Sequence, residues 1–105
     1  MLVNSRENRV VEGTVEVSYG DDPVRGIEVV TAALTAEPGV VADPAVQVGI
    51  QSFGESGIEL SYRCWVPTTA FFEVQYRVNL AVWTGLRDAG LTIPVPQRDV
   101  HIRDA

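Results

Sequence analysis

The chain has 105 residues, 46% of them hydrophobic, which suits one globular domain with its own core. Its formal net charge is −6 and all eight cationic side chains are arginines, which argues against binding a nucleic-acid phosphate backbone. No apolar run reaches the roughly 20 residues of a membrane span, and no signal peptide precedes residue 10, so the chain is expected to be soluble. Its single cysteine, Cys64, excludes an internal disulfide or a cysteine-cluster metal site and indicates a reducing compartment.

The first half of the chain predicts a strand, a helix and a second strand. Residues 10–19 alternate between apolar and polar side chains, with Gly13 marking a weak point or a bulge. Asp22 is the expected N-cap of a helix, with Pro23 at its first position. The helix ends before residue 38 and has a predicted buried stripe of Val24, Ile27, Val30, Ala33 and Leu34. Alternation returns over residues 46–51.

The second half predicts a hairpin, a longer helix and a stiff exit. A turn at residues 53–57 leads into a third alternating strand over 58–66. Thr68 or Thr69 is expected to cap a helix whose apolar set is Phe71, Val74, Val78, Val82 and Leu86. Gly90 is its expected left-handed C-cap. Pro94 and Pro96 then hold the chain extended towards a short last strand, Asp99 to Ile102.

This order of elements predicts an α+β, ferredoxin-like βαββαβ fold, with a four-stranded, mostly antiparallel sheet and two helices on one face. The other face is expected to be uncovered and polar, and Trp65, its one large aromatic side chain, suggests a contact. The residues expected on that face are Thr14, Glu16, Gln47, Gln51, Glu59, Ser61, Arg63 and Trp65.

A structural role is favoured over an RNA-binding role for the open sheet face, and likewise over a reactive role for Cys64. A sheet that binds single-stranded RNA needs aromatic side chains on its central strands and a basic surround, whereas here Trp65 is accompanied by Glu16 and Glu59. Cys64 is expected to point into the core as a small hydrophobic residue, because reactive cysteines need accessible, electropositive surroundings.

Catalytic, phosphate and calcium sites are not expected. His101 and Asp99 could form a carboxylate-oriented imidazole, but no nucleophile or oxyanion donor accompanies them, so we interpret the pair as part of a solvated or interface strand. Residues 54–57 join two strands and do not open a helix, which argues against a phosphate loop. Asp21 and Asp22 lack the ligand spacing of a calcium loop. No cofactor and no metal are expected.

Several short motifs, taken in order, resemble the C-terminal cytoplasmic α/β domain of the small-conductance mechanosensitive channel (MscS-like) family, over nearly the whole chain. The most specific is the Ile-Pro-x-Pro-Gln run at residues 93–97, although Val95 stands where an aromatic residue is usual. The other matching segments are residues 4–6, 15–19, 43–44, 53–58, 63–66, 89–90 and 98–101.

The resemblance implies a channel that opens under membrane tension, built from membrane helices, a middle β domain and then this domain, assembled as a homoheptameric cage on the cytoplasmic side of the inner membrane. Residues 1–9 would be the junction with the middle domain, residues 10–97 the α/β domain, and residues 98–105 the strand of an oligomeric barrel. The pore helices would be absent from this chain. The isolated domain is expected to be a monomer or a weak oligomer.

By the same resemblance, Glu12 and Ser52 correspond to the rim of side portals through which ions and small solutes pass. Asp99, Val100, His101, Ile102 and Trp65 correspond to the oligomer interface. Glu12 is acidic and Ser52 is neutral, and the hypothesis is that Glu12 raises the local cation concentration at a portal.

Two alternatives remain open. The chain could be a free-standing module of the same architecture that binds a small molecule or regulates a partner, and that dimerises through its sheet. An enzyme that uses Asp99 and His101 is the third interpretation.

Overall fold

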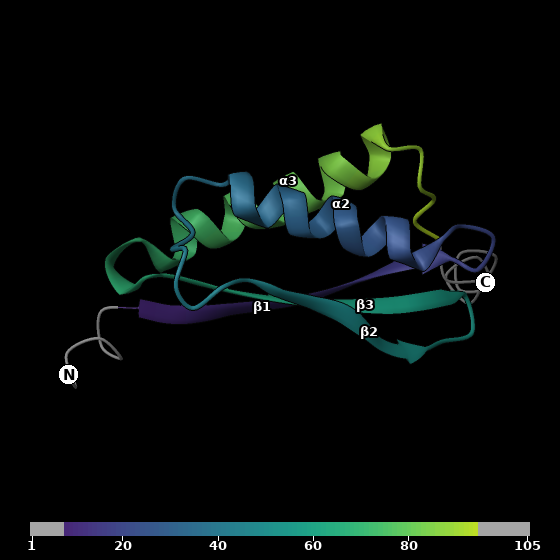
Figure 1. Ribbon diagram of the computed structural model, residues 1–105, viewed down its shortest axis with the longest axis horizontal. Coiled ribbons are helices and arrows are strands. Elements are labelled where there is room, and N and C mark those ends of the chain that lie inside the picture. Colours follow the sequence, from purple (N-terminus) through teal and green to yellow (C-terminus); the bar gives the residue numbers. More distant parts are fainter. Residues whose placement is uncertain (1–7, 95–105) are drawn as a thin grey trace, which may run out of the picture.

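The computed structural model describes residues 8–94, in which a layer of three strands is covered on one face by two helices (Figure 1). In chain order the elements are β1 (Asn8–Ser18), α2 (Pro23–Ala36), β2 (Gln47–Phe53), β3 (Gly57–Pro67), a 3-10 turn η1 (Thr68–Ala70) and α3 (Phe71–Asp88). The predicted types and order of the elements are confirmed as far as residue 94.

The sheet has the order β1–β3–β2, and both neighbouring pairs are antiparallel. The ferredoxin-like topology predicted from the sequence would add a fourth strand to these three. The predicted fourth strand, Asp99 to Ile102, lies outside the described residues, so the four-stranded topology stays a prediction. The register of β1 against β3 is continuous through Gly13, so of the two alternatives predicted there, a weak point or a bulge, the bulge is wrong. The irregularity is in β2 instead, between Ile50 and Ser52.

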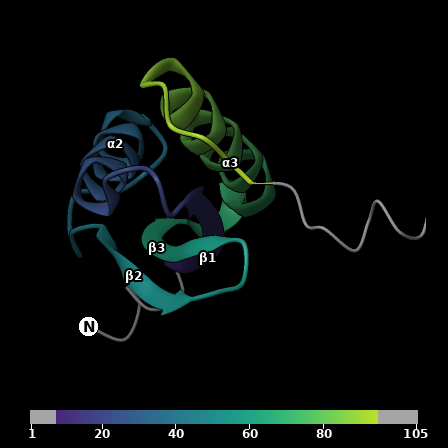
Figure 2. The same cartoon turned by 90° about the vertical axis from the view of Figure 1, so that its right-hand side faces the viewer.

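The core lies between the sheet and the helices, and Figure 2 shows α2 above the β2 side of the sheet and α3 above the β1 side. The predicted inward alternation of β3 is confirmed, because Ile58, Leu60, Tyr62, Cys64 and Val66 are all buried. The predicted four-residue repeat of α3 is also confirmed at Val74, Val78, Val82 and Leu86, whereas Phe71 is only partly buried.

α2 begins as predicted but is turned differently from the expected stripe. Asp22 Oδ1 accepts a hydrogen bond from the Val24 amide at 3.0 Å, and Pro23 follows at the first helical position. The buried positions are Gly26, Val30 and Leu34. Val24 is 58% exposed, so its predicted burial is wrong. Two residues before Gly26 is about 200° around a helix, which places Val24 on the opposite side.

The two ends of α3 differ in how well they were predicted. Residues 68–70 form a 3-10 turn and the N-cap residue of α3 is Ala70, so the predicted threonine cap is wrong. Gly90 has a φ of 82°, as expected of a left-handed C-cap. Its amide donates to the Arg87 carbonyl and the Leu91 amide to the Leu86 carbonyl, both at 3.0 Å, which is a Schellman motif. Leu91 then packs against the core.

The segment after α3 is tied to the end of β1. The Thr92 amide donates to Asp21 Oδ2 at 2.7 Å, and the Thr92 carbonyl accepts from the Ser18 amide at 3.0 Å. Both contacts hold the chain beside the β1–α2 turn just before Pro94. Within residues 8–94, neither helix has the combination of length and hydropathy needed to cross a bilayer.

Candidate functional site

The helix-free face of the sheet carries the polar side chains in cross-strand rows. On β3 these are the residues that alternate with the buried ones, and the register places partners from β1 and β2 on either side of them. The three rows, written β1–β3–β2, are Glu12–Arg63–Gln47, Thr14–Ser61–Gly49 and Glu16–Glu59–Ser52. The predicted polar face is therefore confirmed for Thr14, Glu16, Gln47, Glu59, Ser61 and Arg63, whereas Gln51 lies at the irregularity of β2 and belongs to no row.

The two predicted rim residues, Glu12 and Ser52, lie on this same face but in different rows. Glu12 Oε2 is 2.8 Å from Arg63 Nη2, so its charge is offset by a neighbouring guanidinium. Both side chains are about half exposed, and an exposed pair of this kind contributes little to stability. Its effect is on the local field, because a paired carboxylate attracts cations less than a free one.

Ser52 belongs to the acidic row. Its hydroxyl donates to Glu59 Oε1 at 2.8 Å, and Glu59 lies directly opposite Glu16 across β3 and β1. Among residues 8–94, neither Glu16 nor Glu59 has a cationic partner within 4.0 Å. Two like charges facing each other destabilise a sheet and leave this end of the face negative.

A shallow hollow of about 550 Å³ lies on this face, around the first two rows. It is lined mostly by polar groups: Glu12, Gly13, Thr14, Gln47, Val48, Gly49, Gln51, Ser61, Tyr62 and Arg63. Within residues 8–94, no three His, Cys, Asp or Glu side chains gather as metal ligands, and no buried side-chain nitrogen or oxygen lacks a hydrogen-bond partner.

The buried titratable groups on the helix side are structural. Burial raises the pKa of the Cys64 thiol to about 11, with a smaller contribution from the Glu37 carboxylate, so the group stays a neutral thiol. Burial likewise raises the pKa of Tyr62, whose hydroxyl donates to Asn79 Oδ1 at 2.6 Å. The interpretation of Cys64 as a core residue is confirmed.

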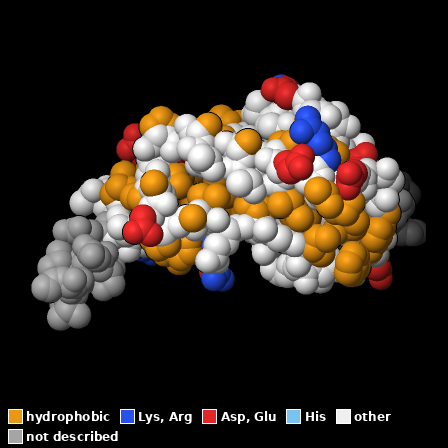
Figure 3. All heavy atoms as spheres, in the orientation of Figure 1, with side chains coloured by type: hydrophobic (Ala, Val, Ile, Leu, Met, Phe, Trp, Pro, Cys, Tyr) orange, Lys and Arg blue, Asp and Glu red, His pale blue; other side chains and the backbone are white. Residues whose placement is uncertain are grey.

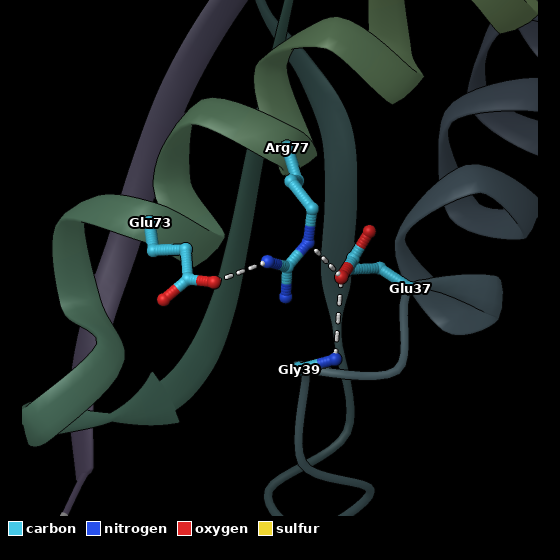
Figure 4. Close-up of polar contacts among 4 residues, drawn as sticks. All are labelled: Glu37, Gly39, Glu73 and Arg77. Carbon is cyan, nitrogen blue, oxygen red and sulfur yellow. Dashed lines mark hydrogen bonds and ion pairs between the residues drawn. The ribbon is translucent and has the colours of Figure 1, made fainter.

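A charged network joins the end of α2 to α3 (Figure 4). Arg77 Nε donates to Glu37 Oε2 at 2.8 Å, and Arg77 Nη1 donates to Glu73 Oε2 at 3.1 Å. The same Glu37 oxygen accepts from the Gly39 amide at 3.3 Å. The hydrogen bond with Glu37 raises the pKa of Arg77, so the cation persists at any physiological pH. This network fixes the loop after α2.

The predicted oligomer-interface residues are only partly described. Trp65 is half-buried at the end of the sheet, opposite Val10. Asp99, Val100, His101 and Ile102 lie outside the described residues. The sequence interpretation missed the outward side of α3, where Phe72, Tyr76, Leu80 and Trp83 are exposed. Their 4-4-3 spacing was a helical signal that could have revealed them.

A family model described as "Mechanosensitive ion channel MscS, C-terminal" matches residues 11–93. An uncharacterized MscS family protein of Archaeoglobus fulgidus is 29% identical over 92 residues, which is 88% of this chain and 32% of that protein. Another, from Synechocystis, is 30% identical over 63 residues, covering 60% of this chain and 21% of that protein. The chain thus spans about a third or less of the length of these relatives.

Two solved structures share the fold. The crystal structure of Helicobacter pylori MscS in its closed state superimposes with a TM-score of 0.80 at 20% identity, over 88% of this chain and 37% of that one. The cryo-EM structure of Arabidopsis thaliana MSL1 gives a TM-score of 0.72 at 14% identity, over 86% and 35%.

Proposed function

This chain belongs to the mechanosensitive ion channel MscS family, and on that premise we propose that it is the assembly and solute-filter domain of a channel that opens under membrane tension. The observation that carries the proposal is the family match over residues 11–93, made by a domain whose fold agrees with the H. pylori channel at a TM-score of 0.80. Membership of an ion-channel family also agrees with the expectation that this chain is not an enzyme.

In this proposal seven copies form a cage on the cytoplasmic side of the inner membrane. Residues 1–9 join a preceding β domain, and residues 98–105, with Asp99 to Ile102 as a strand, close the cage as a barrel. The hydrogen bonds of Thr92 with Asp21 and Ser18 support this arrangement, because they fix the position from which the chain continues towards residues 98–105. The pore helices belong to other parts of the channel.

Ions and small solutes enter the cage through portals whose rim includes Glu12 and Ser52. Since Glu12 is paired with Arg63, the pair as a whole contributes little net field, and we assign the negative potential of the rim to Glu16 and Glu59 beside Ser52. Replacing Glu12 by Gln therefore leaves Arg63 unpaired and shifts ion preference towards anions. Replacing Glu59 by Gln shifts it the same way, whereas Arg63→Gln shifts it towards cations.

A chimera tests the proposal. Residues 11–93 replace the matching segment of the H. pylori channel, and membrane-tension-activated currents and survival of osmotic downshock are measured in cells that lack their own channels. A conducting chimera, with reversal potentials that move in opposite directions for Arg63→Gln and Glu59→Gln, is the expected result. A chimera that reaches the membrane and assembles but whose ion preference ignores all three changes refutes the filter role.

The hollow on the helix-free face favours a second candidate, a free-standing regulatory module that binds a small polar molecule and dimerises through its sheet. Its volume of about 550 Å³ is in the range of small-molecule sites. A melting shift of the chain with a particular metabolite, lost in Arg63→Ala, supports this candidate over the channel domain.

A further inference from the structure

α3 exposes a stripe of large apolar side chains on the side away from α2. Phe72 is 62% exposed, Tyr76 67%, Leu80 63% and Trp83 46%. At about 100° per residue these four fall within an arc of roughly 80°. We call them the α3 patch. Gly85, whose backbone lies close to Val29 of α2, is on the opposite side of the helix.

The α3 patch borders the outer edge of β1. Within the described residues β1 pairs with β3 alone, so its outer edge carries no strand. Between this edge and α3 is a groove of about 330 Å³, lined by residues of β1, by Tyr62 of β3 and by Asn79, Val82 and Trp83 of α3. Arg87 lies 4.7 Å over the ring of Trp83 and holds it beside the groove.

A second apolar patch lies on the opposite flank, where β2 enters its hairpin and α2 begins. Phe53 is 69% exposed, Val24 58%, Tyr19 50% and Ile50 41%. The Tyr19 hydroxyl donates to the Gly54 carbonyl at 2.5 Å, which holds its ring beside the hairpin. We call these four residues the β2 patch. Figure 3 shows hydrophobic side chains gathered at this end of the molecule.

The two patches are matched in size and placed at opposite flanks. From typical aromatic side-chain areas, each exposes roughly 400–500 Å² of apolar surface. One such patch is ordinary for a monomer, but two on opposite flanks are what a head-to-tail arrangement of identical copies requires, since each copy presents two different surfaces. A foreign partner would account for only one of them.

We infer that the α3 patch of one copy packs against the β2 patch of the next copy, and that this contact joins neighbouring domains around the ring. The inference rests on the proposed cage and adds the surface that builds it. The combined area of roughly 800–1,000 Å² is below that of a standard stable interface. The contact is therefore weak between free domains and becomes effective when a tether raises the local concentration to millimolar levels.

Cysteine pairing of the 105-residue chain tests the geometry. Leu80→Cys and Phe53→Cys variants are prepared separately, mixed and exposed to a mild oxidant, and native Cys64 is buried and does not compete. The mixture is expected to give a disulfide-linked dimer at least tenfold faster than either variant alone. The matched control replaces Phe53→Cys with Thr35→Cys, an exposed position on α2 outside both patches, and is expected to give no excess dimer.

Sedimentation equilibrium up to about 1 mM, the range of a tethered contact, gives an independent measure. Leu80→Asp is expected to weaken self-association at least tenfold and Thr35→Asp to leave it unchanged. Three results overturn the inference: faster dimerisation of Leu80→Cys with itself, association that ignores Leu80→Asp, or a monomer at every concentration. None of them alters the chimera test, so the interface can fail while the proposed channel function stands.

Discussion

Gly13 is the residue whose replacement gives the sharpest test of the packing between β1 and β3. The Tyr62 ring lies across it, and a Cβ added at Gly13 would stand 2.5 Å from both Cζ and Oη of that ring. Ordinary carbon contacts are about 3.5–4.0 Å, so the ring must move by about 1 Å in a Gly13→Ala variant. The move also strains the hydrogen bond from Tyr62 to Asn79.

The magnitude follows from three contributions. Overpacking costs about 1–3 kcal/mol and the weakened hydrogen bond about 0.5–1.5 kcal/mol, while alanine in place of a strand glycine returns about 0.5–1 kcal/mol. Gly13→Ala should therefore lower the free energy of unfolding by about 2 kcal/mol, the centre of a span of about 0.5–4 kcal/mol. For a domain of this size a loss of about 2 kcal/mol corresponds to a fall in Tm of about 8–16 °C.

Urea unfolding followed by tryptophan fluorescence and circular dichroism measures the change, with two controls. Gly49→Ala is the matched control, because a Cβ at that strand glycine meets nothing within 4 Å, and its stability should be unchanged or slightly higher. In a Tyr62→Leu background, which removes the ring atoms nearest Gly13, the added methyl group should cost less than about 1 kcal/mol. An equal cost of Gly13→Ala in both backgrounds refutes the steric argument.

Three further predictions concern stability alone. Burial raises the pKa of the Cys64 thiol from 9.0 to about 11, so the folded state holds this proton more tightly than the unfolded state. The free energy of unfolding should therefore be unchanged below pH 9 and fall by about 2–3 kcal/mol as the pH rises towards 11. Chemical denaturation at a series of pH values measures this fall, which should be smaller in Cys64→Ala. Gly57→Ala should lower the free energy of unfolding by more than about 3 kcal/mol in the same assay, because the new Cβ collides with the Val17 backbone carbonyl of β1, which cannot move aside. A stability like that of wild type would contradict the register of β1 against β3. Asp22→Ala should cost about 1 kcal/mol by loss of the α2 N-cap, and Asp22→Asn should keep most of it.

The sequence predicts the inward-facing pattern well. The alternation along β3 and the four-residue repeat of α3 both name residues that are buried. Such patterns can be read without a structure because they follow from the geometry of a single element: side chains alternate along a strand and return every 3.6 residues around a helix. Caps governed by local backbone conformation, Asp22 and Gly90, are also predicted correctly.

The features that depend on a second element are the ones that the sequence does not contain locally. The role of Gly13 depends on the residue across the ladder, and the charge at Glu12 depends on Arg63, 51 positions later in the chain. Both pairings follow from the strand register, which is set by the whole sheet. Whether Val24 is buried or exposed depends on which side of α2 faces the sheet. That side is the one with Gly26, since Leu60 of β3 lies 3.1 Å from an ideal Cβ on this glycine.

The two faces of α3 explain why its outward patch was missed and why it is informative. Both faces carry apolar residues at helical spacing, so periodicity alone cannot say which face is buried. In the structure the fully buried positions of α3 carry three valines and Leu86, whereas Phe72, Tyr76 and Trp83 are exposed. Aromatic side chains have large apolar areas and gain the most from burial. The contact inferred above between neighbouring copies would bury the exposed aromatic side chains of α3 together with Leu80.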